Sequence, residues 1–465
     1  MSATTSNLAQ QERAGIPALI FWIAAVSLLP AAALLGGMAM VLIGLAVCLA
    51  VLVYQRPAEA PGVAMLYLFA AGILLPYSSR FDFTLQSSEM YYWAAGLLVI
   101  TAGAVARLGL RRVSAVPLSA KVFLAVAFAA AVYGETHGAT TSYVLRQLYG
   151  VLLLIVYFGI ARHIGNQELL LRRIQAFGVL CAVCFIVYYA AVFSEYGFHK
   201  EMGYIGEQAA FLATPLFIAG VERKKYSWVL GALVMLLVPA LNFTRRDILT
   251  FLMGLLIALV IKVKSSTVRG LCYGAIVLVT LSSLYPPVTE LVAEKLLTVP
   301  VVGPLIPEGG RDASTLLGRV EQLSVSLETV RVHPWLGGGL GGELVMIMPI
   351  TGELSADNFV DNGWAYLLQK TGLVGAAAFL WLLITMFRGL SREAVGLTAC
   401  LLSATIVTMF SQPAFLHFTT APYLGTYAGF LLASRRRRVL QATTPAAIAA
   451  PGQHGWLHDE ESAHS

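Results

Sequence analysis

The stretch WVLGALVMLLVPALNFTRRDILTFLMGLLIALVIK, from Trp228 to Lys262, consists of two apolar runs joined by a short polar connection that holds two adjacent arginines. Each run approaches the length that a helix needs to cross the hydrocarbon core of a bilayer. The whole chain has this character, because its 465 residues are 58% hydrophobic and only 12% charged. A water-soluble globular protein usually carries about twice that charged fraction. The stretch therefore predicts an integral membrane protein built from helices.

Apolar segments of roughly 15 to 22 residues recur from Ile16 to Ala433, with short polar connections between them. We predict an all-α polytopic membrane protein with about 12–14 transmembrane helices. The segment after Arg13 resembles a cleavable signal peptide, but a second span follows at once, which favours a signal anchor. The predicted spans are centred near residues 25, 44, 69, 98, 125, 153, 183, 215, 234, 255, 277, 379, 402 and 426.

Basic side chains predict the orientation, because cytoplasmic loops are enriched in Lys and Arg. If Arg13 is cytoplasmic and the spans alternate, most basic clusters share its side, namely Arg107, Arg111, Arg112, Arg162, Arg172, Arg173, Arg223, Lys224, Lys225, Lys262, Lys264, Arg269, Arg388, Arg392 and Arg435 to Arg438. The net charge of +6 is then a property of the cytoplasmic face and calls for no nucleic acid partner.

The same orientation divides the chain into five parts. These are a cytoplasmic N-terminus (1–15), a transmembrane bundle (16–284), a large acidic periplasmic loop (285–360), C-terminal transmembrane helices (361–434) and a disordered cytoplasmic tail (435–465).

All five cysteines fall inside predicted spans, where apolar packing is favoured over redox or metal chemistry. Glu353, Asp357 and Asp361 have the spacing of a divalent cation site, but a solvated acidic loop is much commoner. We predict no metal and no cofactor.

The two arginines of the opening stretch violate two electrostatic preferences. The count of spans places Arg245 and Arg246 outside, and Thr244 with Asp247 resembles a capping box, which puts both arginines in the first turn of a helix. The helix dipole is positive there and repels cations. Phosphate or pyrophosphate bound at this helix start would relieve both conflicts. The alternative is that the pair reaches into the outer headgroup layer and binds lipid phosphate nonspecifically.

Other basic residues on the same side could join this pair. Arg146 and Lys370 lie inside predicted spans, where a charge costs roughly 3 kcal/mol at the centre, so we expect a wet or protein-lined cavity around them. A structural ion pair is their alternative role. Arg319 and Arg331 lie on a predicted amphipathic helix, and a solvated helix face is the alternative for them.

That helix carries an apolar stripe at helical spacing and ends near His333-Pro334. The stripe consists of Leu316, Val320, Leu323, Leu327 and Val330, and it would lie against the outer membrane surface or roof a cavity between spans. The next segment, HPWLGGGLGG (His333 to Gly342), contains a G-x-G-x-x-G without the preceding strand of a dinucleotide site. We predict a tight re-entrant turn with close backbone approach. His333 is favoured as part of the helix stop over a catalytic base.

A third pattern, DNGWAYLLQKTGLVG (Asp361 to Gly375), places Asp361 and Asn362 at the mouth of a span. A carboxylate there is ionised at neutral pH and can accept a proton from a sugar hydroxyl. Its alternative role is to cap the following helix.

With these three patterns the chain resembles the O-antigen ligase and polymerase superfamily of bacterial membrane glycosyltransferases. The resemblance is carried by LNFTRRDIL, GRVEQLSVSLETVRVHPWLGGGLG and DNGWAYLLQKTGLVG, roughly residues 240–375. Asn362, Gly372 and Gly375 fit the last motif of the ligases, but Asp361 stands where a ligase has histidine. The resemblance implies a glycosyltransferase C-like membrane fold in the bacterial inner membrane, with both termini cytoplasmic. The aspartate favours a polymerase of O-antigen or exopolysaccharide repeats.

The predicted reaction transfers oligosaccharide from a polyprenyl pyrophosphate donor to a glycan or lipid acceptor at the periplasmic face. Arg245 and Arg246, with Arg146 or Arg319, would stabilise the leaving pyrophosphate without a metal, and Asp361 would deprotonate the acceptor. Further candidates for substrate binding are Asn362, Arg331, Lys370 and His333. The bilayer and polysaccharide-assembly proteins are the other expected partners. The alternatives are an O-antigen ligase that uses lipid A core and a transporter or flippase of lipid-linked glycan.

Overall fold

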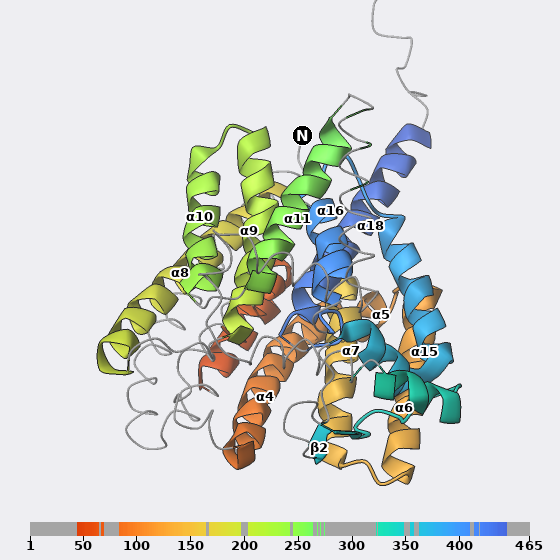
Figure 1. Cartoon of the computed structure of the whole chain (residues 1–465). Coiled ribbons are helices and arrows are strands. Elements are labelled where there is room, and N and C mark those ends of the chain that lie inside the picture. The colour runs from red at the N-terminus through yellow and green to blue at the C-terminus, as the bar shows by residue number, and fades with distance from the viewer. Residues whose placement is uncertain are drawn as a thin grey trace, which may run out of the picture.

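The computed structural model describes residues 44–64, 67–68, 83–163, 167–196, 203–241, 245–263, 267, 270, 274, 322, 324–347, 354–357, 362–409, 413–417 and 419–443. Figure 1 shows these residues as a bundle of helices, with the ends of α6 and α7 and the strand β2 at its lower side.

Helices dominate the described part of the chain, which confirms the predicted fold class. An apolar run without alternation satisfies its backbone groups internally only as a helix when lipid surrounds it. The elements are η1 (Pro57–Glu59), α4 (Phe83–Leu108), α5 (Leu110–Val113), α6 (Leu118–Thr136), α7 (Thr141–Ala161), α8 (Gln167–Tyr196), α9 (Gly203–Glu222), α10 (Tyr226–Leu241), α11 (Arg245–Lys262), β1 (Leu344–Ile347), β2 (Leu354–Asp357), α15 (Gly363–Phe387), α16 (Val395–Ser403), η4 (Ala404–Thr408) and α18 (Ala421–Thr443).

Four described helices are long and apolar enough to cross a membrane, namely Leu118–Thr136, Thr141–Ala161, Gln167–Val187 and Gly363–Phe387. Shorter apolar helices span Gly44–Gln55, Ala94–Leu108, Gln208–Glu222, Tyr226–Leu241 and Val395–Thr408. Each of them contains a predicted span centre. The span predicted near residue 25 lies outside the described residues, and the one near residue 277 has only isolated positions described, so the total of 12–14 stays a prediction.

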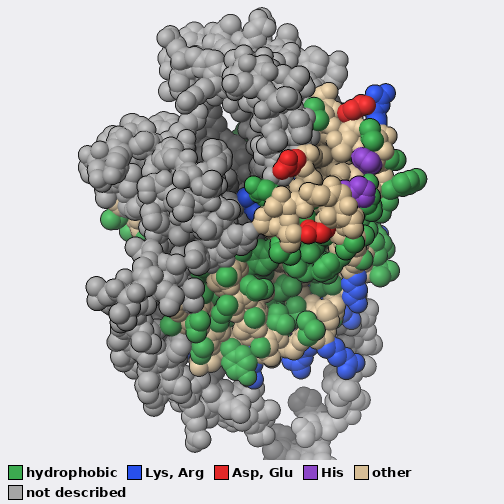
Figure 2. Space-filling model, turned by 90° about the horizontal axis from the view of Figure 1, so that it is seen from below, with side chains coloured by type: hydrophobic (Ala, Val, Ile, Leu, Met, Phe, Trp, Pro, Cys, Tyr) green, Lys and Arg blue, Asp and Glu red, His purple; other side chains and the backbone are tan. Residues whose placement is uncertain are grey.

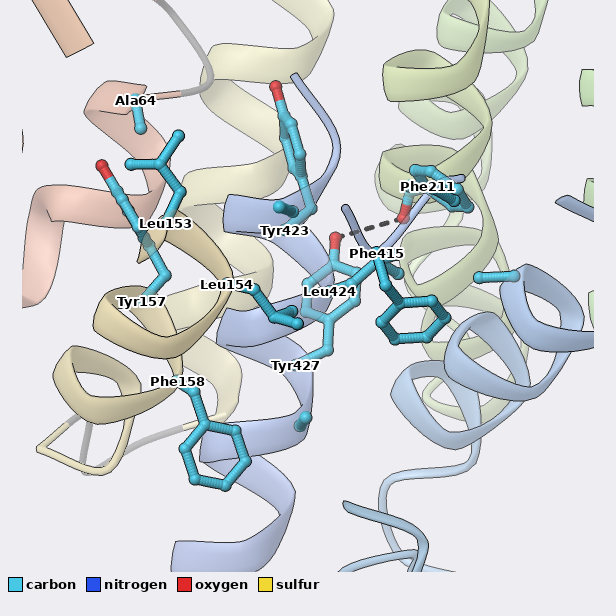
Figure 3. Close-up of a cluster of buried hydrophobic side chains, with 14 of the residues drawn as sticks. Ala64, Leu153, Leu154, Tyr157, Phe158, Phe211, Phe415, Tyr423, Leu424 and Tyr427 are labelled. Atoms are coloured by element: carbon cyan, nitrogen blue, oxygen red, sulfur yellow. Dashed lines mark hydrogen bonds between the residues drawn. The ribbon is translucent and has the colours of Figure 1, made fainter. Parts of the chain in front are cut away.

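The centre of the bundle is an aromatic core between α7, α9 and α18. Tyr427 is fully buried, and its hydroxyl donates a hydrogen bond to the backbone oxygen of Phe211 at 3.1 Å (Figure 3). Gly425 and Gly429 lie one turn apart on α18 against α7, where a Cβ atom would stand 2.4 Å from Leu154 O and 2.2 Å from Phe158 O. Glycines at this spacing allow two membrane helices to approach backbone to backbone. This contact fixes α7, which carries one of the predicted site residues.

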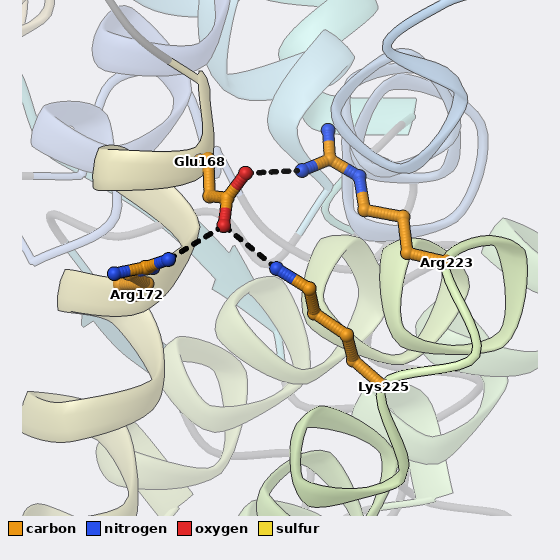
Figure 4. A network of polar contacts seen from close by, with 4 residues as sticks. All are labelled: Glu168, Arg172, Arg223 and Lys225. Atoms are coloured by element: carbon orange, nitrogen blue, oxygen red, sulfur yellow. Dashed lines mark hydrogen bonds and ion pairs between the residues drawn. The ribbon is translucent and has the colours of Figure 1, made fainter.

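Basic side chains meet on one face of the bundle. Glu168 Oε1 lies 2.8 Å from Arg172 Nη2 and 2.7 Å from Lys225 Nζ, and Glu168 Oε2 lies 3.5 Å from Arg223 Nη1 (Figure 4). These groups are exposed to solvent, which weakens each ion pair, so the pairs contribute little to stability. The ion pairs show that the basic clusters at the start of α8 and in the α9–α10 turn lie on the same face of the bundle. The sequence predicts this shared face.

The start of α11 lies at the other end of its helix from this basic face. Lys262, in the last turn of α11, pairs with Glu222 at the end of α9, with Nζ and Oε1 3.0 Å apart. Arg245 and Arg246 begin α11, so they occupy its first turn as predicted. The arginine pair is therefore separated from the basic face by the length of the helix.

Candidate functional site

The glycine-rich segment His333–Gly342, here called the glycine loop, follows a helix whose described residues are 322 and 324–332. The helix ends where the sequence predicts, at His333. Its buried side chains are polar, because Gln322 and Ser326 are buried whereas Leu327 of the predicted apolar stripe is 48% exposed. Of the predicted stripe the structure describes only Leu327, which is exposed, and Val330, which is half-buried, so the location of the stripe stays a prediction.

The glycine loop is inserted into a break in α15. Gly372 has φ 62° and interrupts the helix, which frees backbone groups on both sides of it. Leu373 N donates to Pro334 O at 2.9 Å and Val374 N to Trp335 O at 3.3 Å, while Gly338 N donates to the oxygen of Gln369 at 2.7 Å. Broken helices inside membrane proteins require such replacement partners. The loop and the break therefore stabilise each other, and the predicted re-entrant turn has a specific docking place.

On its other side the glycine loop contacts the α6–α7 hairpin. Leu340 N donates to Ala130 O of α6 at 2.9 Å. A Cβ atom on Gly134 would stand 2.0 Å from Leu340 O, and one on Gly339, at φ 79°, would stand 2.5 Å from Gly134 Cα. Glycine is thus required on both sides of this contact, as the predicted close backbone approach implies.

Two buried polar side chains hold the end of the loop. Gln147, on α7, accepts a hydrogen bond from Gly341 N at its Oε1 atom, at 2.7 Å. Lys370, on α15, is fully buried and donates from Nζ to the oxygen of Gly342. The same ammonium group lies 5.8 Å from the centre of the Tyr366 ring. Lys370 therefore has the protein-lined surroundings that the sequence predicts.

Arg146 lies next to Gln147 on α7 and is half-buried. Within the described ranges its guanidinium forms no hydrogen bond and no ion pair, and its charge interacts with the phenol of Tyr366 on α15. Arg146 and Lys370 both interact with Tyr366, and Gln147 and Lys370 bond adjacent residues at the end of the glycine loop. A half-buried cation without an anion is unfavourable, so this arrangement is suited to binding an anion.

Asn362 caps α15, whereas the sequence analysis gave this cap as the alternative role of Asp361. Its Oδ1 atom accepts hydrogen bonds from Trp364 N at 2.9 Å and from Ala365 N at 3.1 Å, which makes it the N-cap of α15. Asp361, the residue before this cap, lies outside the described residues, as does Arg319. For Arg245 and Arg246 only the backbone is described. The role of these four residues stays a prediction.

The two remaining candidates lie on the outer surface. The side chain of Arg331 is 80% exposed and pairs with Glu328, with Nη1 and Oε2 3.1 Å apart. This is the solvated helix face that was the alternative role for Arg331. His333 is exposed, and its Nδ1 atom lies 3.3 Å from the Tyr133 hydroxyl. The exposed His137 stacks on the same tyrosine, with ring centres 4.0 Å apart, and Figure 2 shows histidine side chains gathered at one edge of this face.

Sequence reasoning did not identify Gln147, Tyr366 or Tyr133. Gln147 and Tyr366 each lie close in sequence to a predicted cation, but only the fold shows that they face the same loop. Among the described side chains, no group of three or more His, Cys, Asp or Glu residues could hold a metal ion.

Comparison with known families finds one match within this region. Residues 230–380 match the family model described as O-antigen ligase. A comparison with curated proteins finds no match. The matched residues include the start of α11, the glycine loop and the first turns of α15, whereas Arg146 lies outside them.

Proposed function

We propose, from the premise that the chain belongs to the O-antigen ligase and polymerase superfamily, that it polymerises oligosaccharide repeat units at the periplasmic face of the bacterial inner membrane. The superfamily gives the chain a membrane glycan-transfer function. The donor in this proposal is a polyprenyl-pyrophosphate-linked oligosaccharide, and the acceptor is a sugar hydroxyl on another lipid-linked repeat unit. Both termini lie in the cytoplasm.

The observation that carries the proposal is the half-buried guanidinium of Arg146. No described residue neutralises it, and it lies beside a second cation, Lys370, which is already bonded to the glycine loop. A pyrophosphate group would supply the missing negative charge, and a guanidinium can bind two of its oxygens at once. Arg245, Arg246 and Arg319 add to the same anion site in this proposal.

The chemical step is a displacement at the anomeric carbon of the donor sugar. Asp361 accepts the proton of the acceptor hydroxyl while its oxygen forms the new glycosidic bond. The bond between the anomeric carbon and the pyrophosphate oxygen breaks, and polyprenyl pyrophosphate leaves with the bonding electrons. The arginines stabilise this leaving group, and the anomeric configuration is inverted. Because Asn362 caps α15, the carboxylate of Asp361 is not needed for the cap.

Two other functions fit parts of the site. An O-antigen ligase would use the same donor and transfer the glycan to lipid A core, and the O-antigen ligase family match favours it as the second candidate. The aspartate in the position of the ligase histidine favours the polymerase. A flippase would bind the pyrophosphate of the lipid-linked glycan with the same cations while it moves across the membrane, and would transfer no sugar.

The polymerase is tested with purified protein in liposomes that contain lipid-linked repeat units. We expect a ladder of longer glycans on a gel, because each transfer adds one repeat. Glycan movement across the bilayer without elongation would identify a flippase, and transfer to added lipid A core without elongation would identify a ligase. Glycan profiles of a deletion strain give an independent check, since single attached repeats indicate a lost polymerase and free polymer indicates a lost ligase.

A further inference from the structure

The helices α7 and α18 contact each other along one face of each helix, backbone to backbone. A Cβ atom on Gly425 would stand 2.4 Å from Leu154 O, and one on Gly429 would stand 2.2 Å from Phe158 O. The contact advances by four residues in the same direction on both helices, which is about one helical turn. The two helices therefore run parallel and in a fixed register.

This register brings two arginines to the end of the contact. Four residues after Phe158, Arg162 is the C-cap of α7, and four residues after Gly429 lies Ala433, whose side chain is small. Arg436 follows three residues later, a spacing that keeps it on the same face of α18. Arg162 and Arg436 thus extend from neighbouring helices at nearly the same level, and their charges interact.

Within the described part of the chain, no acidic side chain accompanies these two charges. Arg162 is half-buried, and its burial, followed by the charge of Arg436, lowers the pKa of its guanidinium. Both groups remain protonated at neutral pH, so they repel each other. Neither guanidinium bonds to a described residue, whereas the neighbouring Arg435 donates from Nη1 to the oxygen of Arg388. Two like charges are therefore held together where α7 ends.

The level of this pair along α7 matches that of lipid headgroups. The segment Thr141–Ala161 is long and apolar enough to cross a membrane, and Arg162 follows it directly. A span of this length has its ends near the headgroups. Basic groups between membrane helices at such a level bind the phosphates of anionic lipids. The two free oxygens of a phosphodiester could accept hydrogen bonds from one guanidinium each.

We propose that Arg162 and Arg436 form a binding site for the phosphate of an anionic phospholipid headgroup at the ends of α7 and α18. The site lies on the basic face, because α8 follows α7 in the chain and carries Glu168 in its first turn. It is separate from the candidate functional site, since Arg146 lies about 24 Å away along the axis of α7. The bound phosphate offsets the repulsion between the two arginines and so stabilises the packing of α7 against α18.

The test measures thermal unfolding of the delipidated full-length protein in an uncharged detergent. The protein is titrated with phosphatidylglycerol, with phosphatidylcholine or with inorganic phosphate. We expect phosphatidylglycerol, at about 100 times its dissociation constant, to raise the unfolding temperature by about 3 °C or more, and the other two to raise it by less than about 1 °C. An equal rise with phosphatidylcholine or with inorganic phosphate would overturn the assignment to an anionic lipid.

The variants Arg162→Met and Arg436→Met each remove one guanidinium and keep an unbranched side chain. We expect the dissociation constant for phosphatidylglycerol to rise about tenfold or more in both, because a hydrogen bond between charged groups contributes a factor of this size. Without added lipid, Arg436→Met should unfold at the wild-type temperature or above it, since the repulsion between the arginines is removed.

The matched control is Arg112→Met, which removes an exposed positive charge from α5 and should bind phosphatidylglycerol like the wild type. Equally weakened binding in Arg112→Met would indicate a general attraction to basic side chains and would overturn the site. Unchanged binding in either site variant would also overturn it. If Arg162→Met does not fold, Arg436→Met decides, because Arg436 is exposed. None of these measurements depends on glycan transfer, so they leave the proposed function to its own test.

Discussion

Arg146→Met should lower kcat/KM for the lipid-linked donor by about 100-fold to 1000-fold, the loss expected when one preorganised donor to a developing negative charge is removed. The same substitution should leave the unfolding temperature in detergent unchanged or raise it. The reason is that an unpaired, half-buried cation is unfavourable when no substrate is bound, and methionine keeps an unbranched side chain without the charge. A loss of activity without a loss of stability would indicate that Arg146 binds the donor and does not stabilise the fold.

Rate measurements with proteoliposomes and thermal unfolding of the same preparations check this prediction. Arg112→Met, an exposed arginine on α5, is the control and should change neither quantity. Arg245→Ala, Arg246→Ala and Asp361→Asn should lower the rate comparably if these residues share the site. A wild-type rate in Arg146→Met, or a rate lost only in proportion to a lowered stability, would show that Arg146 does not bind the donor.

Much of the fold could be predicted because lipid imposes simple local rules. A span must satisfy its own backbone groups, so length and apolarity identify helices such as α6, α7 and α15 directly. The end of the helix at His333 and the close approach of the glycine loop also follow from local signals, namely His-Pro and a run of glycines. The protein-lined surroundings of Lys370 could be predicted because a charged side chain inside a span is very unfavourable in contact with lipid.

The remaining features depend on contacts between distant parts of the chain. In the sequence, Gly134 is one small residue in an apolar run. Its neighbours do not indicate that the backbone of Leu340 packs against it. The orientation of the helix before the glycine loop was also not decided by its periodicity. Of its described side chains, Leu327 is exposed and Ser326 is buried. Where lipid is as apolar as the protein interior, an apolar stripe need not face the protein.

The contact between Gly134 and the glycine loop leads to the second large effect. Gly134→Val should detach the loop from α6, because a Cβ atom there would stand 2.0 Å from the oxygen of Leu340. That oxygen belongs to the backbone of a loop already fixed by the break in α15 and by Gln147, so it cannot move aside without breaking other hydrogen bonds. We expect a loss of roughly 3 kcal/mol or more in stability, the upper part of the range for overpacked sites. The unfolding temperature in detergent should fall by about 5 °C or more.

Gly44→Val provides the control, because no atom of the described residues lies within 4 Å of a Cβ atom built at Gly44. It should unfold like the wild type and elongate glycans at the wild-type rate. Gly134→Val should have no measurable elongation even at temperatures where its helices remain folded, since the glycine loop would leave its contacts with Gln147 and Lys370. Hydrogen exchange across residues 333–342 distinguishes the cause, because faster exchange confined to the loop indicates undocking. If Gly134→Val elongates glycans normally, the loop does not need its contact with α6, and the positions of Gly341 and Gly342 must be fixed by Gln147 and Lys370 alone.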